Sequence, residues 1–164
     1  MKTLLLTRHA KSSWNDASLP DRDRPLTPSG ERDEATMSKR LSQRHVDPNL
    51  IMCSPAVRAF ATARIIARGL DYKRERIAVE DRLYAASMDT LIEVIEELDD
   101  ALDCVMLVGH NPECSALAYH FCSEITHMPT SAIAEFRIDA KRWGGIGDSK
   151  PLKTIFDSPK NESG

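Results

Sequence analysis

The stretch that decides the fold is TLLLTRHAKSSWN, residues 3–15. Its first five residues, 3–7, have the apolar character on both faces that is typical of a strand in the middle of a parallel sheet. That strand ends at Arg8-His9. A second run with the same pattern, VMLVGHNP at residues 105–112, ends at Gly109-His110. In open α/β sheets ligands bind beyond the carboxyl ends of the strands, so both histidines are expected near a ligand site.

The rest of the chain alternates short β-like runs with longer segments of helical spacing, which is typical of βαβ units. Helices are predicted to begin at Thr27-Pro28, Ser54-Pro55 and Asn111-Pro112, because a small polar residue followed by proline supplies an N-cap and a favoured first residue. The sequence predicts an α/β fold, a three-layer α/β/α sandwich around a mostly parallel sheet. The predicted strands are 3–7, 50–53, 77–80, 104–108, 133–138 and, with a weaker pattern, 152–156, and the periodicity of Met88, Leu91, Ile92, Ile95 and Leu98 predicts a further helix.

The length and composition indicate one domain, residues 1–157, followed by a flexible tail at 158–164. The net charge of −3 gives no general attraction to nucleic acid or to anionic lipid. The four cysteines include no C-x-x-C pair, which favours a reducing compartment. The N-terminal apolar run is too short for a signal peptide and no stretch is long enough to span a bilayer, so a cytoplasmic protein is expected.

Four residues at the predicted edge of the sheet suggest a phosphate site. Arg8 and His9 follow the first strand, Arg58 lies in the first turn of the helix after the second, and His110 follows the fourth. Arginine offers planar paired donors to phosphate, and a neutral imidazole among them can attack phosphorus. Each residue alone would more often be structural or solvated, but their joint placement after three strands favours function.

The other histidines and the cysteines have no such placement. His45, His120 and His127 are expected to be exposed or locally hydrogen-bonded. No metal or other cofactor is predicted, because the histidines and cysteines lack short ligand spacing and the two arginines would repel a cation.

These motifs resemble the histidine phosphatase superfamily, with its phosphoglycerate mutase-like fold. The resemblance runs through TLLLTRHAKSSWN (3–15), PLTPSGERDEA (25–35), SPAVRAFATA (54–63) and VMLVGHNP (105–112). It implies that His9 is the nucleophile that becomes phosphorylated, that Arg8 and Arg58 clamp the phosphate, and that His110 contacts it. Asn15 matches an accessory phosphate ligand of the mutase branch.

The chain departs from the superfamily pattern in two places. Ala10 stands where glycine usually follows the catalytic histidine, a mild change. In VEDRLYAAS, residues 79–87, no glutamate falls at the position of the usual leaving-group acid, and Glu80 and Asp81 just upstream are weak substitutes.

The missing acid leads to a hypothesis about the substrate. An alkoxide leaves with a conjugate acid near that of water, at roughly 15.7, so an ester gains greatly from a positioned acid. Imidazole leaves readily once protonated, because its conjugate acid has a pKa of about 6.5. The chain is also similar in size to the short SixA-type phosphohistidine phosphatases, which act on histidine-phosphotransfer domains.

The sequence therefore predicts a metal-independent hydrolase that transfers phosphoryl from phosphohistidine on a protein to His9 and then to water. A broad or sugar-phosphate phosphomonoesterase of the same superfamily is one alternative. A module that binds phosphohistidine without turnover is another. A nucleotide-binding module is disfavoured because neither glycine-rich phosphate motif is present.

Overall fold

A computed structural model describes residues 1–161, and within these residues a sheet of six strands forms the centre of the molecule. The strands lie in the order β3-β2-β4-β1-β5-β6. Neighbours among β1 to β4 are parallel, whereas β5 runs antiparallel to both of its neighbours, β1 and β6. The mostly parallel sheet with β1 and β4 at its centre is as predicted. The strands are β1 (Lys2–Arg8), β2 (Leu50–Cys53), β3 (Ala78–Val79), β4 (Cys104–Gly109), β5 (Ile133–Ile138) and β6 (Lys153–Asp157).

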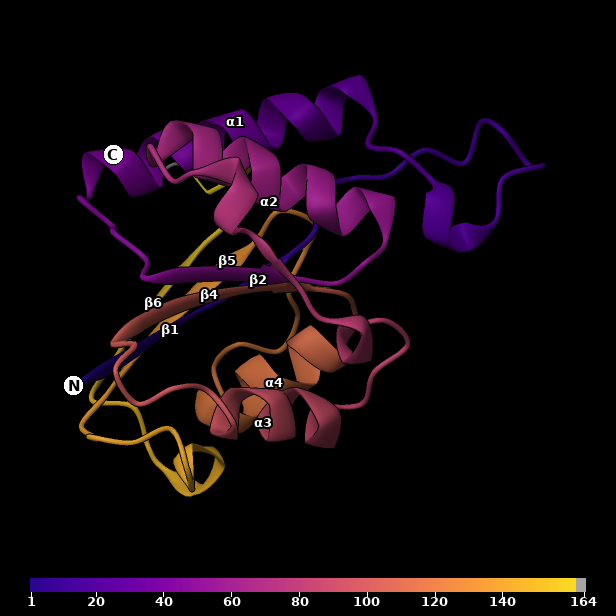
Figure 1. The fold of residues 1–164 in the computed structure, drawn as a ribbon. Helices are drawn as coiled ribbons and strands as arrows, with labels where there is room; N and C mark the ends of the chain where they lie inside the picture. The colour runs from indigo at the N-terminus through magenta and orange to yellow at the C-terminus, as the bar shows by residue number, and fades with distance from the viewer. Residues whose placement is uncertain (162–164) are drawn as a thin grey trace.

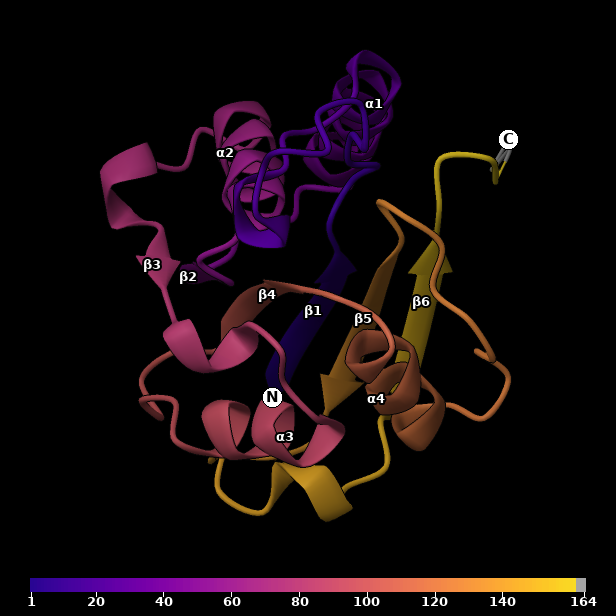
Figure 2. The ribbon, with the colours of Figure 1, turned by 90° about the vertical axis from the view of Figure 1, so that its right-hand side faces the viewer.

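Helices cover both faces of the sheet (Figure 1). The helices α1 (Pro28–Gln43) and α2 (Val57–Gly69) pack on one face, and α3 (Met88–Glu96) and α4 (Glu113–Phe121) on the other. Each face has its own apolar core, one beneath α1 and α2 and one beneath α3 and α4. This confirms the three-layer α/β/α sandwich. Figure 2 looks along the sheet toward the end where β1 and β4 finish.

The predicted helix starts are right for one helix and wrong for two. The helix α1 begins at Pro28, and the Thr27 Oγ1 accepts a hydrogen bond from the Gly30 amide at 2.9 Å. The helix α2 begins two residues later than predicted, at Val57, and α4 begins one residue later, at Glu113. The start of α2 is later because the Ser54 side chain accepts a hydrogen bond from the Ala56 amide in a turn that precedes the helix. Asn111 lies two residues ahead of α4, although its Oδ1 still accepts from the Ser115 amide at 3.1 Å.

The loop after β1 is held against α1 and α2. A bridge pairs Ser12 with Leu26, and a short 3-10 turn, Asp21–Asp23, lies between them along the chain. A Cβ on Gly30 would lie 2.4 Å from the Lys11 carbonyl oxygen, so only glycine permits this approach of α1 to the loop. The loop that follows His9 is thus fixed on the α1 and α2 side of the sheet.

The predicted tail, 158–164, lies partly outside the described residues, which end at 161. Arg40 of α1 donates hydrogen bonds to the carbonyls of Ser158 and Pro159, at 2.9 and 3.3 Å, so this part of the tail is attached to the domain. No helix in the described part of the chain combines the length and the apolar character needed to cross a membrane.

Candidate active site

The two histidines are brought together by strand register. Arg8, the last residue of β1, pairs with Gly109, the last residue of β4, in a parallel ladder. The next residue of each strand is therefore a neighbour, and the rings of His9 and His110 lie with their centroids 5.0 Å apart. Both rings are almost fully buried, with 7% and 6% of each residue exposed.

The ring of His9 is oriented by its own backbone neighbour. The Nδ1 of His9 lies 2.7 Å from the carbonyl oxygen of Ala10. Because a carbonyl only accepts hydrogen bonds, this contact places the proton of the neutral ring on Nδ1 and leaves the lone pair on Nε2. Burial lowers the pKa of His9 from 6.5 to about 3. The hydrogen bond to the Ala10 carbonyl raises this pKa in part, while the nearby His110, Arg58 and Arg8 lower it further. The ring is neutral at physiological pH and carries a nucleophilic nitrogen.

His110 is held by the serine that was expected to cap α2. Its Nε2 lies 2.8 Å from the Oγ of Ser54, while its buried Nδ1 has no hydrogen-bond partner among residues 1–161. Burial lowers the pKa of His110 from 6.5 to about 4, assisted by the charge of Arg58. A neutral ring with one free nitrogen can offer a hydrogen bond to a ligand in the site.

The two predicted arginines each keep a buried donor free. Arg58, 6% exposed, donates to the Asp21 carbonyl at 2.6 Å and to the Asp21 carboxylate at 3.0 Å. Arg8 donates to the Met128 carbonyl at 3.0 Å. The Nε atoms of both guanidinium groups are buried and lack partners in the described part of the chain. Unpaired buried donors are costly, so these atoms favour an anion as the missing partner.

Asp21 ties the loop after β1 to Arg58. Its carboxylate also accepts from the Tyr84 hydroxyl at 2.6 Å and from Arg24 at 3.2 Å. The Tyr84 hydrogen bond, followed by Arg58, lowers the pKa of Asp21 to about 2. This carboxylate stays ionised near neutral pH and therefore positions Arg58 rather than supplying a proton.

A pocket of about 330 Å³ opens beside these groups. His9 is not among the residues that line it, but its ring lies beside the ring of His110, which is one of them. The lining residues are Asp21, Arg58, Tyr84, Ala85, Ala86, His110, Asn111, Pro112 and Glu113.

The remaining predicted residues lie elsewhere. Asn15 is exposed in the loop after β1 and does not line the pocket, so its phosphate role stays a prediction. Glu80 accepts two hydrogen bonds from Arg82, which lower its pKa, and Asp81 is exposed. Neither carboxylate lines the pocket.

The three histidines that were set aside are exposed: His45, His120, which also contacts the Gly147 carbonyl, and His127. In the part of the chain that the structure describes, no three His, Cys, Asp or Glu side chains are placed to hold a metal ion.

Sequence reasoning missed several residues of the site. Asp21, Tyr84 and Glu113 come from loop or helix-end positions that no spacing rule singles out. Thr62 was also missed: its hydroxyl donates to the Arg58 carbonyl at 2.8 Å and accepts from the Ala10 amide at 2.9 Å. It connects α2 to the loop of His9, and only its position four residues after Arg58 on a helix could have indicated this contact.

Comparison with known proteins shows the family of this chain. Residues 4–101 match the histidine phosphatase superfamily, branch 1. The chain belongs to this superfamily. It is 33% identical over 164 residues to the uncharacterized protein Rv1276c of Mycobacterium tuberculosis, covering 93% of this chain and 99% of that one.

Solved structures extend the comparison to the SixA type. A candidate SixA phosphohistidine phosphatase from Agrobacterium tumefaciens superposes with a TM-score of 0.79 at 25% identity, covering 94% of this chain and 97% of that one. The protein histidine phosphatase SixA complexed with tungstate superposes with a TM-score of 0.78 at 22% identity, covering 96% and 97% of the two chains. This histidine phosphatase is SixA-like in fold, and its superfamily supports phosphatase activity.

Proposed function

We propose that this phosphatase hydrolyses phosphohistidine on a protein by way of a phosphorylated His9. The observation that carries the proposal is the contact between Nδ1 of the buried His9 ring and the Ala10 carbonyl, which leaves Nε2 as the nucleophile. Arg8 and Arg58 supply buried donors for the phosphoryl oxygens, and His110 supplies a further contact through its free Nδ1. Asn15 is proposed only as an accessory phosphate ligand, since it lies in the loop that follows His9.

The reaction has two steps. First, His9 Nε2 forms a bond to phosphorus as the P–N bond of the substrate breaks and the substrate imidazole takes the electron pair. Water then attacks the phosphoryl group on His9, the new P–N bond breaks, and inorganic phosphate leaves with the neutral ring restored. The charge on the transferred group is spread over arginine and histidine donors, so the proposed reaction uses no metal or other cofactor.

Two observations favour phosphohistidine over an ester. The pocket wall where the superfamily often places an acid consists of Tyr84, Ala85 and Ala86. The fold is also like that of the Agrobacterium protein named for phosphohistidine hydrolysis. The proposed partner is a histidine-phosphotransfer protein, and the four free thiols support a cytoplasmic location.

A phosphomonoesterase is the second candidate. It is favoured by one feature of the pocket, the lining residue Glu113, whose carboxyl group could protonate an alkoxide.

The test is phosphate release from a phosphohistidine-bearing phosphotransfer protein and from an aryl phosphate, with wild type and His9→Ala side by side. We expect wild type to prefer the protein substrate and His9→Ala to show no turnover. A strong preference for the aryl phosphate would move the assignment to a phosphomonoesterase. Tight binding without release from either substrate would indicate a binding module instead.

A further inference from the structure

Glu113 is a buried carboxylate beside the phosphate-binding groups that the two-step reaction does not use. It is the first residue of α4, directly after the turn in which the Cys114 amide donates to the His110 carbonyl at 2.9 Å. It lines the same pocket as His110 and Arg58, with 4% of the residue exposed. The hydrogen bonds to its carboxyl group come from the backbone at Glu113 and Ala86. Burial raises its pKa, and the backbone at Glu113 and Ala86 only partly offsets this effect.

The surroundings of Glu113 suit a flat ring that carries an N–H group. Ala85, Ala86 and Pro112 give the neighbouring wall of the pocket short apolar side chains. A carboxylate that has lost water and has only backbone partners gains most from a charged or strongly polar N–H donor. Arg58 is the pocket's cation, and Asp21 already occupies its terminal nitrogens. The unpaired Nε of Arg58 is the donor proposed for the phosphoryl oxygens, so the donor for Glu113 comes with the ligand.

We propose that Glu113 determines specificity by accepting a hydrogen bond from the imidazole nitrogen of phosphohistidine that does not carry phosphorus. This inference rests on the proposed function. The protonated form of a phosphorylated imidazole is the one that leaves as a neutral ring, because the electron pair of the broken P–N bond returns to a ring that already has its proton. Glu113 favours that form in the bound substrate, and no proton has to move during the first step. An ester substrate has no such N–H group, so it cannot make this hydrogen bond to Glu113.

The experiment compares wild type with Glu113→Gln on three probes: a phosphohistidine-bearing phosphotransfer protein, phenyl phosphate and glycerol phosphate. Glutamine keeps the shape of the side chain and removes its charge. We expect kcat/KM for the phosphohistidine protein to fall by about tenfold or more, as for a lost charge-assisted hydrogen bond, with less than a twofold change for both esters. Asp89→Asn is the matched control, because Asp89 is an exposed acidic residue in the first turn of α3 and lies outside the pocket.

Two results would overturn the inference. An equal loss on all three probes, accompanied by a lower melting temperature, would assign Glu113 to the stability of α4. A loss that is largest for glycerol phosphate, whose leaving group is the most basic, would make Glu113 a proton donor. Failure of the proposed function itself looks different, because wild type would then show no preference for the phosphohistidine protein before any substitution is made.

Discussion

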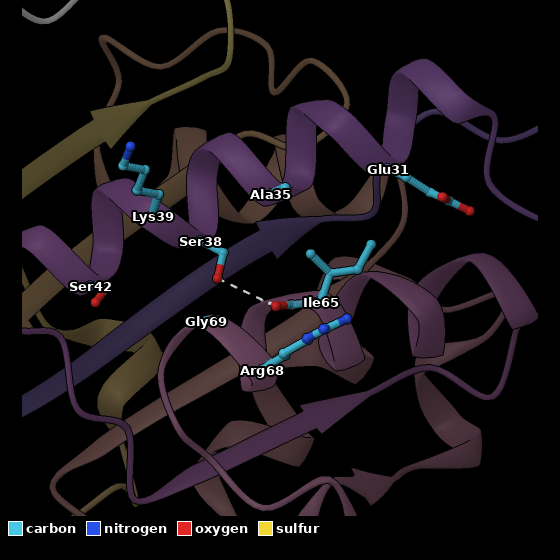
Figure 3. Close-up of a pocket in the computed structure, with 8 residues that line it drawn as sticks. All are labelled: Glu31, Ala35, Ser38, Lys39, Ser42, Ile65, Arg68 and Gly69. Carbon is cyan, nitrogen blue, oxygen red and sulfur yellow. Dashed lines mark hydrogen bonds between the residues drawn. The ribbon is translucent and has the colours of Figure 1, made fainter.

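The groove between α1 and α2 encloses about 540 Å³, whereas the pocket at the carboxyl ends of the strands encloses about 330 Å³. The groove is lined by exposed side chains such as Glu31, Lys39 and Arg68, and the hydroxyl of Ser38 donates to the Ile65 carbonyl across it at 3.3 Å (Figure 3). The pocket is smaller, yet buried imidazole and guanidinium nitrogens without partners in residues 1–161 lie beside it. Volume therefore does not identify the site. Buried polar groups that lack partners, gathered where strands end, identify it better.

The largest expected difference between the pocket and the groove is in kcat/KM, and two arginines on the same helix measure it. Arg58 and Arg68 both belong to α2, the first buried beside the pocket and the second exposed in the groove. Arg58→Ala should lose one or two charge-assisted hydrogen bonds of about 1.5 to 3 kcal/mol each, or roughly ten- to more than a hundredfold in kcat/KM per bond. Arg68→Ala should stay within twofold of wild type. Steady-state kinetics of the two variants, with melting temperatures as control, would refute the distinction if Arg58→Ala also stayed within twofold.

A second difference concerns protonation of the buried rings. With pKa values of about 3 for His9 and about 4 for His110, both rings should remain neutral well below pH 6.5. Between the folded and unfolded pKa values the unfolded chain binds more protons, so these two residues make the free energy of unfolding decrease as the pH falls below about 6.5. NMR titration of the imidazole C–H signals measures this directly, with free histidine in the same buffer as reference. A midpoint near 6.5 for either ring would contradict its burial.

The smallest expected effect is at Asp21, which lies between the pocket and solvent. Its side chain is 47% exposed, so its ion pair with Arg58 is partly screened. Asp21→Asn keeps oxygen acceptors for Arg58 and Tyr84 and should lower kcat/KM by about fivefold at most, the equivalent of about 1 kcal/mol. Added salt should lower kcat/KM of wild type more than that of the variant. A hundredfold loss would show that Asp21 takes part in the reaction itself.

The parts of this architecture that follow regular patterns were predictable from the sequence. Alternating runs gave the strands, and the shared ends of β1 and β4 brought His9 and His110 to the same edge because parallel strands finish together. The start of α2 was not predictable, since Ser54 binds His110 instead of capping the helix. That contact joins residues 56 positions apart and has no local signal.

The remaining residues of the site lie in loops or at a helix end, where the spacing of residues in the sequence does not predict contacts. Asp21 meets Tyr84 across 63 residues of sequence, and only the folded chain shows that this carboxylate holds Arg58. Glu113 resembles an ordinary acidic residue in the first turn of a helix, which favours the helix dipole wherever it occurs. Its place in the pocket depends on how α4 packs beside the segment 84–86.

Locating the phosphoryl group during turnover tests whether His9 is the nucleophile. Wild type and His9→Ala would be mixed with a radiolabelled phosphohistidine-bearing protein, quenched in alkali within milliseconds, digested and analysed by mass spectrometry. We expect label on Nε2 of His9, because the Ala10 carbonyl occupies Nδ1, and a loss of turnover of more than about 10³-fold in His9→Ala. Label on another side chain, or turnover by His9→Ala within tenfold of wild type, would contradict this role of His9.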